Sequence, residues 1–212
     1  YVANSFRTIE NIGWQHAEPV LRSLAYALLA HEGDNPAKRD AEADRPGRQN
    51  IELVKTIPDD WLAGDHDPGR AVSLLPILRE GSAADASSAV ADLLRRRVHP
   101  QAVWDVLLGF AGELMMRRSD ILSLHAITSA NAMYYAYRRV SDERLRKFLL
   151  LQNAAFMTLF RREPGEIADK KRFIDQMQPL AVEGDSAIEE IFATISTDKP
   201  AAAAKVLGYC KD

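Results

Sequence analysis

The sequence has almost no cysteine with which to cross-link a small fold. Its 212 residues include a single cysteine, Cys210, so no disulfide can form within the chain. One cysteine is typical of a protein in a reducing compartment, and a periplasmic protein without disulfides would have the same composition. Apolar residues make up 47% of the chain and charged residues 27%. This composition is typical of a globular protein that folds around a hydrophobic core.

Features that define several other classes of protein are also missing. The sequence has no apolar run long enough to predict a membrane span. Its net charge is −3, without the basic excess of a nucleic-acid-binding protein. The first residues, YVANSFRTIE, lack the features of a signal peptide, and both ends of the sequence are abrupt. We therefore expect part of a longer, soluble protein, cytoplasmic, or periplasmic if a signal has been removed.

The common catalytic and cofactor motifs are absent as well. There is no GxGxxG fingerprint, P-loop, HExxH or CxxC motif, GxSxG elbow or pair of ExxH motifs. The sequence therefore names no cofactor and no metal. It also lacks the alternating apolar pattern of β-strands and the Asn-Gly signal of hairpins.

What the sequence does contain is helical periodicity. Apolar residues recur every three to four positions in segments that predict helices at residues 18–33, 68–81, 82–100, 99–120, 119–139, 141–162, 186–197 and 200–210. Ser82, Ser119 or Asp120, and Ser141 are expected N-caps, and Pro100 suits a first turn. The predicted fold class is all-α, a compact bundle of about eight to ten helices.

The expected organisation is one helical domain over residues 1–212. Residues 32–50 are rich in charge, Pro and Gly, which predicts a mobile polar loop or insertion. Residues 163–212 are expected to form C-terminal helices that pack on the central bundle. The stretches that begin at Ala3 and Ala130 share an Ala-Asn start and a later apolar helix, so a duplicated helix pair is an alternative organisation.

Residues 121–139, ILSLHAITSANAMYYAYRR, carry no charge before Arg138. The segment predicts a buried helix with His125, Thr128 and Tyr135 on one face and Asn131 beside it. Buried polar groups need hydrogen-bond partners, so we expect these side chains to border a pocket. The alternative is a core histidine that forms its hydrogen bonds with neighbouring protein groups, with the Thr128 hydroxyl bonded to the backbone of its own helix.

Glu113 is embedded in the apolar run VLLGFAGELMM of the preceding predicted helix. A short turn joins this helix to the next, so Glu113 and His125 should lie at a similar depth on antiparallel helices. This predicts an acid or a metal ligand that faces His125. The alternative is an ion pair with Arg117, four residues along the same helix.

A third cluster surrounds the start of the predicted helix at residues 18–33. Trp14, His16, Glu18 and Arg22 lie close together in the sequence, and Glu18 and Arg22 are spaced for an ion pair. A histidine beside a helix N-terminus favours its neutral form, which can act as a base or a ligand. The alternative is a capping segment with an apolar Trp14 anchor.

The strings LHAITSANAM, LLLQNAAF and IGWQHAEPVLRSLAYALL together resemble segments of the questin-oxidase-like all-helical family. The resemblance covers about a third of the chain. It implies an all-α, oxidoreductase-like fold that acts on a small organic molecule. The one residue that it carries over is His125, as a member of the pocket.

Two functional hypotheses follow. In the first, a buried pocket binds a small organic molecule or a metal, with His125, Glu113 and His16 as the catalytic candidates. The substrate-binding candidates are then Thr128, Asn131, Tyr135, Trp14 and Arg22. In the second, the chain is a non-catalytic helical scaffold or interaction domain, and a homo-oligomer is one form that it could take. Neither hypothesis involves nucleic acid or a membrane span.

Overall fold

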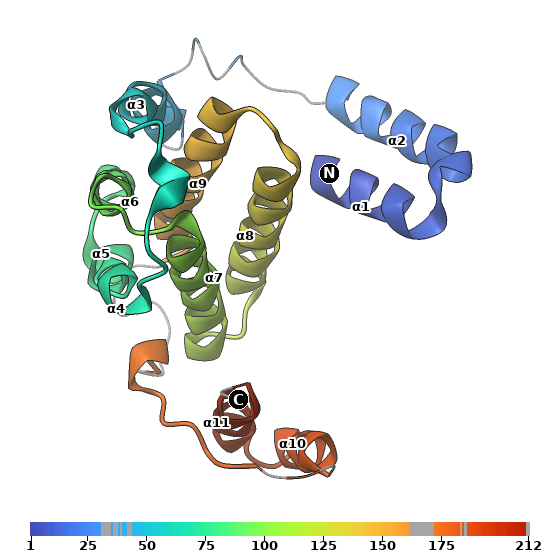
Figure 1. Cartoon of the computed structure of the whole chain (residues 1–212). Helices are drawn as coiled ribbons and strands as arrows, with labels where there is room; N and C mark the ends of the chain where they lie inside the picture. Colours follow the sequence, from blue (N-terminus) through green and yellow to red (C-terminus); the bar gives the residue numbers. More distant parts are fainter. Residues whose placement is uncertain are drawn as a thin grey trace. The chain divides into compact units, whose positions relative to one another are not determined.

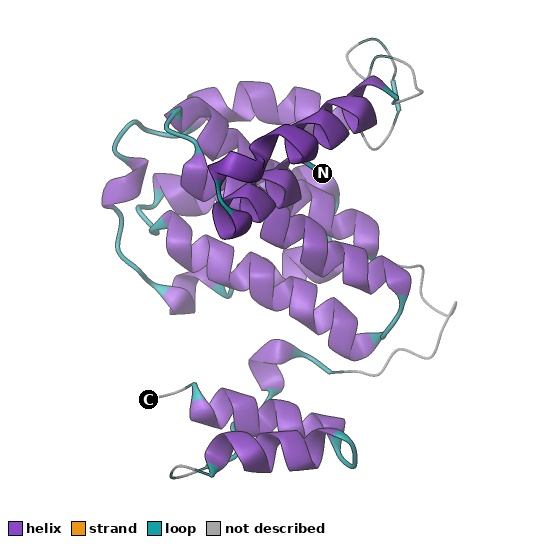
Figure 2. Cartoon of the chain, turned by 90° about the vertical axis from the view of Figure 1, so that its right-hand side faces the viewer, coloured by secondary structure: helices purple, strands orange, loops and turns teal. Residues whose placement is uncertain are grey.

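The protein is all-α, as the sequence predicted, and its helices are shown by a computed structural model (Figures 1 and 2). The structure describes residues 1–30, 35, 38, 40, 41, 44–161, 172–182, 184 and 186–210. Within these residues there is no β-strand, and one isolated bridge pairs Asp65 with Val98. The chain divides into two compact units, residues 1–170 and 171–212, where the sequence had favoured a single domain.

The first unit contains nine of the described α-helices, which are α1 (Val2–Ile12), α2 (Ala17–Leu29), α3 (Arg45–Leu53), α4 (Pro68–Ala71), α5 (Leu74–Glu80), α6 (Ala83–Arg95), α7 (Pro100–Arg117), α8 (Ile121–Arg139) and α9 (Glu143–Met157). Short 3-10 turns join some of them, at η1 (Trp14–His16), η3 (Val54–Thr56), η4 (Trp61–Ala63) and η5 (Thr158–Phe160). The helix predicted over residues 68–81 is therefore two helices, α4 and α5.

The core of the first unit lies around α9, which packs against α6, α7 and α8 (Figure 1). Trp104 and Phe110 of α7 and Leu150 and Leu151 of α9 are fully buried there. Burying a large apolar side chain stabilises a fold by about 1.5–3 kcal/mol. This shared apolar seam fixes the positions of α7 and α8, the two helices on which the sequence placed its candidate site.

Most of the predicted helix starts are confirmed. Ser82 and Asp85 form a reciprocal capping box at α6, and Pro100 lies in the first turn of α7. Asp120 caps α8, accepting a hydrogen bond from the backbone N–H of Ser123 at 2.8 Å. Helix α9 is capped by Asp142 rather than by Ser141. Both residues can cap, and the helix begins one residue later than the sequence suggested.

The sequence did not predict α1 or α3. In α1, Val2, Phe6 and Ile9 recur at helical spacing, and Ile9 is fully buried. Helix α3 begins at Arg45, so residues 45–50 of the predicted polar loop are helical. Its Asn50 is buried and donates a hydrogen bond to Gln152 on α9 at 3.0 Å. This tertiary contact stabilises a helix where the polar composition had predicted a loop. Residues 32–34, 36, 37, 39, 42 and 43 of that loop lie outside the described residues.

The second unit contains η6 (Ile174–Gln176) and the packed pair α10 (Ala187–Ile195) and α11 (Lys199–Tyr209). The backbone N–H of Leu180 donates to the carbonyl of Ala204 at 2.9 Å. Gly208 allows the carbonyl of Leu180 to approach α11, since a Cβ atom there would lie 1.9 Å from that oxygen. None of the helices described in either unit combines the length and the apolar character needed to cross a membrane.

Candidate functional site

Glu113 lies in a buried ion pair rather than in a pocket. Its side chain is fully buried, and the guanidinium of Arg79 on α5 binds it through two hydrogen bonds of 2.9 and 2.6 Å. Arg117, one turn along α7, donates to the same carboxylate at 3.3 Å. The ion pair with Arg117 is the alternative that the sequence offered, and the second partner, Arg79, is 34 residues away. Glu113 is thus turned toward α5, and the guanidinium groups of two arginines bind its carboxylate.

His125 is exposed, and this corrects the prediction of a buried helix. Of the histidines that the structure describes, none is buried. Helix α8 buries a seam formed by Ser123, Ala126, Ala130 and Tyr137, while His125, Thr128 and Asn131 are exposed. The reason is that uncharged polar side chains can form their hydrogen bonds with water, so the lack of charge in this segment did not require burial.

Thr128 forms the local hydrogen bond that the alternative interpretation described. Its hydroxyl donates to the backbone carbonyl of His125 at 3.3 Å, within the same helix. His125 and Glu113 were expected to face each other because they lie at similar depth on paired helices. Depth does not set the direction of a side chain around the helix axis, and here one residue faces α5 and the other faces solvent.

The cluster at the start of α2 is also exposed. His16 and Trp14 lie in the turn η1, and Trp14 contacts the ring of Phe6 edge to face, with ring centroids 6.5 Å apart. Arg22 forms the expected ion pair with Glu18 on the surface of α2. Gly13, with a φ of 96°, makes the turn between α1 and η1 that a residue with a side chain would strain. The geometry is that of a helix start with an apolar contact, which is the alternative given for this segment.

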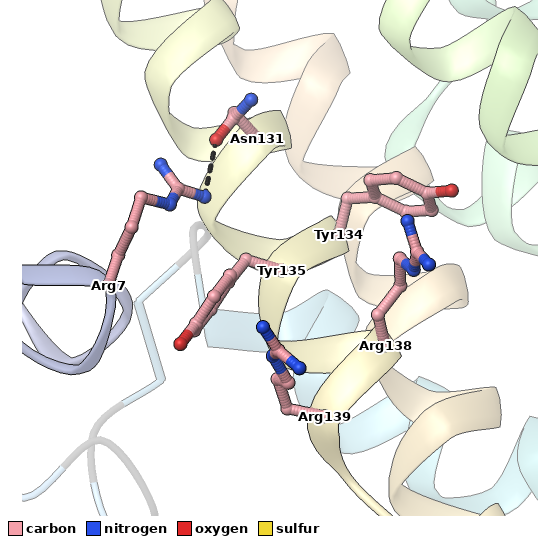
Figure 3. Close-up of a pocket in the computed structure, with 6 residues that line it drawn as sticks. All are labelled: Arg7, Asn131, Tyr134, Tyr135, Arg138 and Arg139. Carbon is pink, nitrogen blue, oxygen red and sulfur yellow. Dashed lines mark hydrogen bonds between the residues drawn. The ribbon is translucent and has the colours of Figure 1, made fainter. Parts of the chain in front are cut away.

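A different pocket lies between α1 and α8. It has a volume of about 290 Å³ and is lined by Arg7, Asn131, Tyr134, Tyr135, Arg138 and Arg139. Figure 3 shows Arg7 reaching from α1 to α8, where it donates a hydrogen bond to the side-chain oxygen of Asn131 at 2.7 Å. We call this the cationic pocket, because three of its six lining residues are arginines and none is acidic.

The charges of the cationic pocket are only partly balanced. Arg139 forms an ion pair with Glu10 of α1 at 3.0 Å. In the part of the chain that the structure describes, Arg7 and Arg138 have no carboxylate partner. The guanidinium of Arg138 lies 5.8 Å from the ring centroid of Tyr134, and Figure 3 shows the two side by side. Two arginines are therefore free to bind an anion.

Tyr135 forms the aromatic wall of the cationic pocket. The guanidinium groups of Arg7 and Arg139 lie 4.8 and 5.4 Å from the centroid of its ring. The pKa of the Tyr135 hydroxyl is raised, first because the group is partly removed from water and then because the carboxylate of Glu10 is near, while Arg139 opposes the shift. The phenol therefore stays neutral and remains a hydrogen-bond donor at ordinary pH.

Behind Tyr134 a group of aromatic rings fixes this face of α8. The ring centroids of Trp104 and Tyr134 lie 5.1 Å apart, and those of Trp104 and Tyr137 lie 5.2 Å apart. The hydroxyl of Tyr134 donates to the side-chain oxygen of Gln101 on α7 at 2.8 Å. Burial raises the pKa of Tyr137, against the lowering effect of Arg146. The pocket wall is thus held by the core and does not depend on a loop.

A second pocket adjoins the first and differs from it in character. It has a volume of about 570 Å³ and lies between the start of α1, α8 and α9. We call it the apolar pocket, because most of its lining is formed by apolar residues, among them Val2, Phe6, Ala132, Met133, Ala136, Val140 and Leu149. Tyr135 and Arg139 belong to the linings of both pockets.

The structure thus brings together part of the predicted site with residues that the sequence had not singled out. Tyr135 and Asn131 line the cationic pocket, whereas Glu113, His125 and His16 line neither pocket. Arg7 was missed because α1 was not predicted. The pair Arg138–Arg139 was visible in the sequence, but basic residues are common in the last turn of a helix, where they favour its dipole.

The described residues contain no group of three or more His, Cys, Asp or Glu side chains that could hold a metal ion. In comparisons with known proteins, no family model, no curated protein and no solved structure matches the chain. The resemblance to the questin-oxidase-like family therefore stays a prediction.

Proposed function

We propose that the protein binds a small organic anion in the cationic pocket between α1 and α8. The observation that carries this proposal is that Arg7, Arg138 and Arg139 all line one pocket whose lining has no carboxylate. Guanidinium groups bind carboxylates and phosphates through charge-assisted hydrogen bonds, often two at a time. The Tyr135 ring adds a flat apolar surface, which an inorganic ion would not use.

The charge balance favours a ligand over a purely structural role. Arg139 has an acidic partner in Glu10 of α1. Arg7 and Arg138 instead lie beside aromatic rings, and their remaining donors are open to a ligand. The positive charges that line this pocket repel one another, and a bound anion would relieve that repulsion.

The proposal is tested by titrating the protein with benzoate and with inorganic phosphate at low ionic strength. We expect binding of benzoate that weakens as salt is added, since the pocket is open to solvent. Replacing Arg138 with Gln removes charge-assisted hydrogen bonds, so the affinity should fall about tenfold or more.

The matched control is Arg96→Gln, which removes the same charge from an exposed position at the end of α6. It should leave the affinity for benzoate unchanged. Equal losses in the two variants would show that the anion responds to overall charge and would reject a specific pocket. Binding of phosphate without benzoate would reject an organic ligand.

A second candidate is an interaction domain, which one feature of α10 favours. Ile188, Phe192 and Ile195 follow one another at helical spacing and are 50%, 68% and 48% exposed. A row of large apolar side chains on one helix face is typical of surfaces that bind another protein or a second copy of the same chain. This function does not depend on the cationic pocket, and both can hold.

A further inference from the structure

The two pockets meet along one helix, which suggests how a ligand would lie. With 100° of rotation per residue, neighbouring positions around α8 follow the order Tyr134, Arg138, Asn131, Tyr135, Arg139, Ala132 and Ala136. The charged and polar residues at the start of this series line the cationic pocket, and the apolar residues at its end line the apolar pocket. Tyr135 and Arg139, in the middle, border both.

Helix α1 has the same division on its facing side. Arg7 extends into the cationic pocket, whereas Val2, Ala3 and Phe6 line the apolar pocket. The two helices thus present matching polar and apolar surfaces to each other across a shared opening. An elongated molecule that passes the ring of Tyr135 would contact both surfaces.

We propose that the ligand is an amphiphilic monocarboxylate, with its carboxylate at Arg7 and Arg138 and its hydrocarbon part in the apolar pocket. This inference rests on the proposed function and narrows it to one chemical class. The volume of the apolar pocket, about 570 Å³, is within the range of sites that enclose small organic ligands. A compact ion such as phosphate would leave this volume unused.

Glu10 determines the orientation of the ligand. It lines the apolar pocket and is ion-paired with Arg139, so the cation on that side is already neutralised. Arg7 and Arg138 have no such partner among the described residues, so the ligand carboxylate is drawn to them. A second carboxylate at the far end of the ligand would enter an apolar space beside Glu10 and be repelled. The site therefore selects a single anionic head.

The test measures the affinity for acetate, hexanoate, octanoate and decanoate by calorimetry, below the concentrations at which they form micelles. Each methylene that is transferred from water to the apolar pocket should tighten binding by up to about fourfold. Octanedioate should bind at least tenfold more weakly than octanoate, because its second carboxylate cannot be accommodated.

Two variants of the full chain separate the pockets. Ala132→Asp places a charge in the wall of the apolar pocket and should abolish the dependence on chain length, so that hexanoate, octanoate and decanoate bind as weakly as acetate does. Met133→Gln is the milder change and should reduce the gain per methylene without altering acetate binding. Circular dichroism checks that both variants keep the wild-type helix content.

The outcomes distinguish this inference from the proposed function. If benzoate binds but the affinity does not rise from acetate to decanoate, the amphiphilic ligand is rejected and the proposed anion-binding pocket is retained. Octanedioate binding as tightly as octanoate would overturn the role of Glu10 and the single anionic head. Failure of benzoate and of every carboxylate to bind would overturn both proposals.

Discussion

At the scale of single residues, the buried carboxylate of Glu113 is the most consequential group. It is fully buried, and Arg79 and Arg117, with 12% and 20% of their side chains exposed, bind it from two helices. Removing charges from water is costly, and the cost is repaid only when geometry and hydrogen bonding are good. The two-pronged contact with Arg79 meets that condition, so the pair ties α5 to α7.

Replacing Glu113 with Gln should lower the free energy of unfolding by about 3 kcal/mol, because Arg79 and Arg117 would keep their charges with no anion between them. Urea denaturation followed by circular dichroism measures the change. Replacing Glu18 with Gln is the control. It breaks an exposed ion pair on α2 and should cost less than about 1 kcal/mol.

The double variant Arg79→Met, Glu113→Leu gives a further check. Well-packed apolar residues can replace a buried ion pair with little loss, so much of the stability lost in Glu113→Gln should return. A loss for Glu113→Gln no greater than that for Glu18→Gln would contradict the structural role assigned to this pair.

Residue types alone predicted that Glu113 must have a partner, but they did not predict which helix supplies that partner or whether His125 is buried. Glu113 was singled out because a carboxylate in an apolar run must find a partner, and it does. The partner within its own turn, Arg117, could be predicted from spacing, whereas Arg79 could not, because no local rule links residues on different helices. His125 was assigned to a pocket on its type, but it is exposed.

At the scale of elements, α8 shows how a helix with few charges can still be amphipathic. Its buried seam consists mainly of small residues, Ser123, Ala126 and Ala130, which let neighbouring helices approach closely. Before Arg138, its exposed positions carry uncharged residues, among them the polar His125, Thr128 and Asn131. A pattern that distinguishes only apolar from charged residues does not separate the buried face from the exposed face, and for that reason the sequence predicted a buried helix.

Asp120 should contribute measurably to α8 as its N-cap. Replacing Asp120 with Ala removes the acceptor for the N–H of Ser123 and should lower the free energy of unfolding by about 1 kcal/mol. Thermal or urea denaturation of the purified variants measures the loss.

Two comparisons make the assignment of Asp120 specific. Asp120→Asn keeps the capping oxygen and should recover most of the stability, although it removes the charge near Arg118. Ser119→Ala, one residue earlier, should be close to neutral. If Asn at position 120 were as unfavourable as Ala, the charge rather than the cap would account for the effect.

At the scale of the whole molecule, the exposed face of α10 gives the second candidate function a direct test. If Ile188, Phe192 and Ile195 form an interface between copies of the chain, light scattering should give a mass above the 23.6 kDa of one chain. Phe192→Ser should then restore the monomer, since it removes the most exposed of the three side chains.

Thr197→Ser is a suitable control for this experiment, because it changes an exposed residue just beyond α10 and keeps its hydroxyl. A mass of one chain at every concentration tested would remove self-association as the use of this face. The cationic pocket lies in the other unit, so this result would not bear on anion binding.

The sequence by itself determined the all-α class, most of the helices in the core and most of their starting residues. These depend on interactions between residues a few positions apart, such as the capping box at Ser82 and the period of the apolar residues. Only the tertiary structure decided which way Glu113 faces, that His125 is exposed, and that α1 lies against α8. Those outcomes depend on how whole helices rotate and pack, and contacts such as Arg7 with Asn131 join residues 124 positions apart. Local spacing carries no information about such pairs, and for that reason the site that the structure offers is not the one that the sequence suggested.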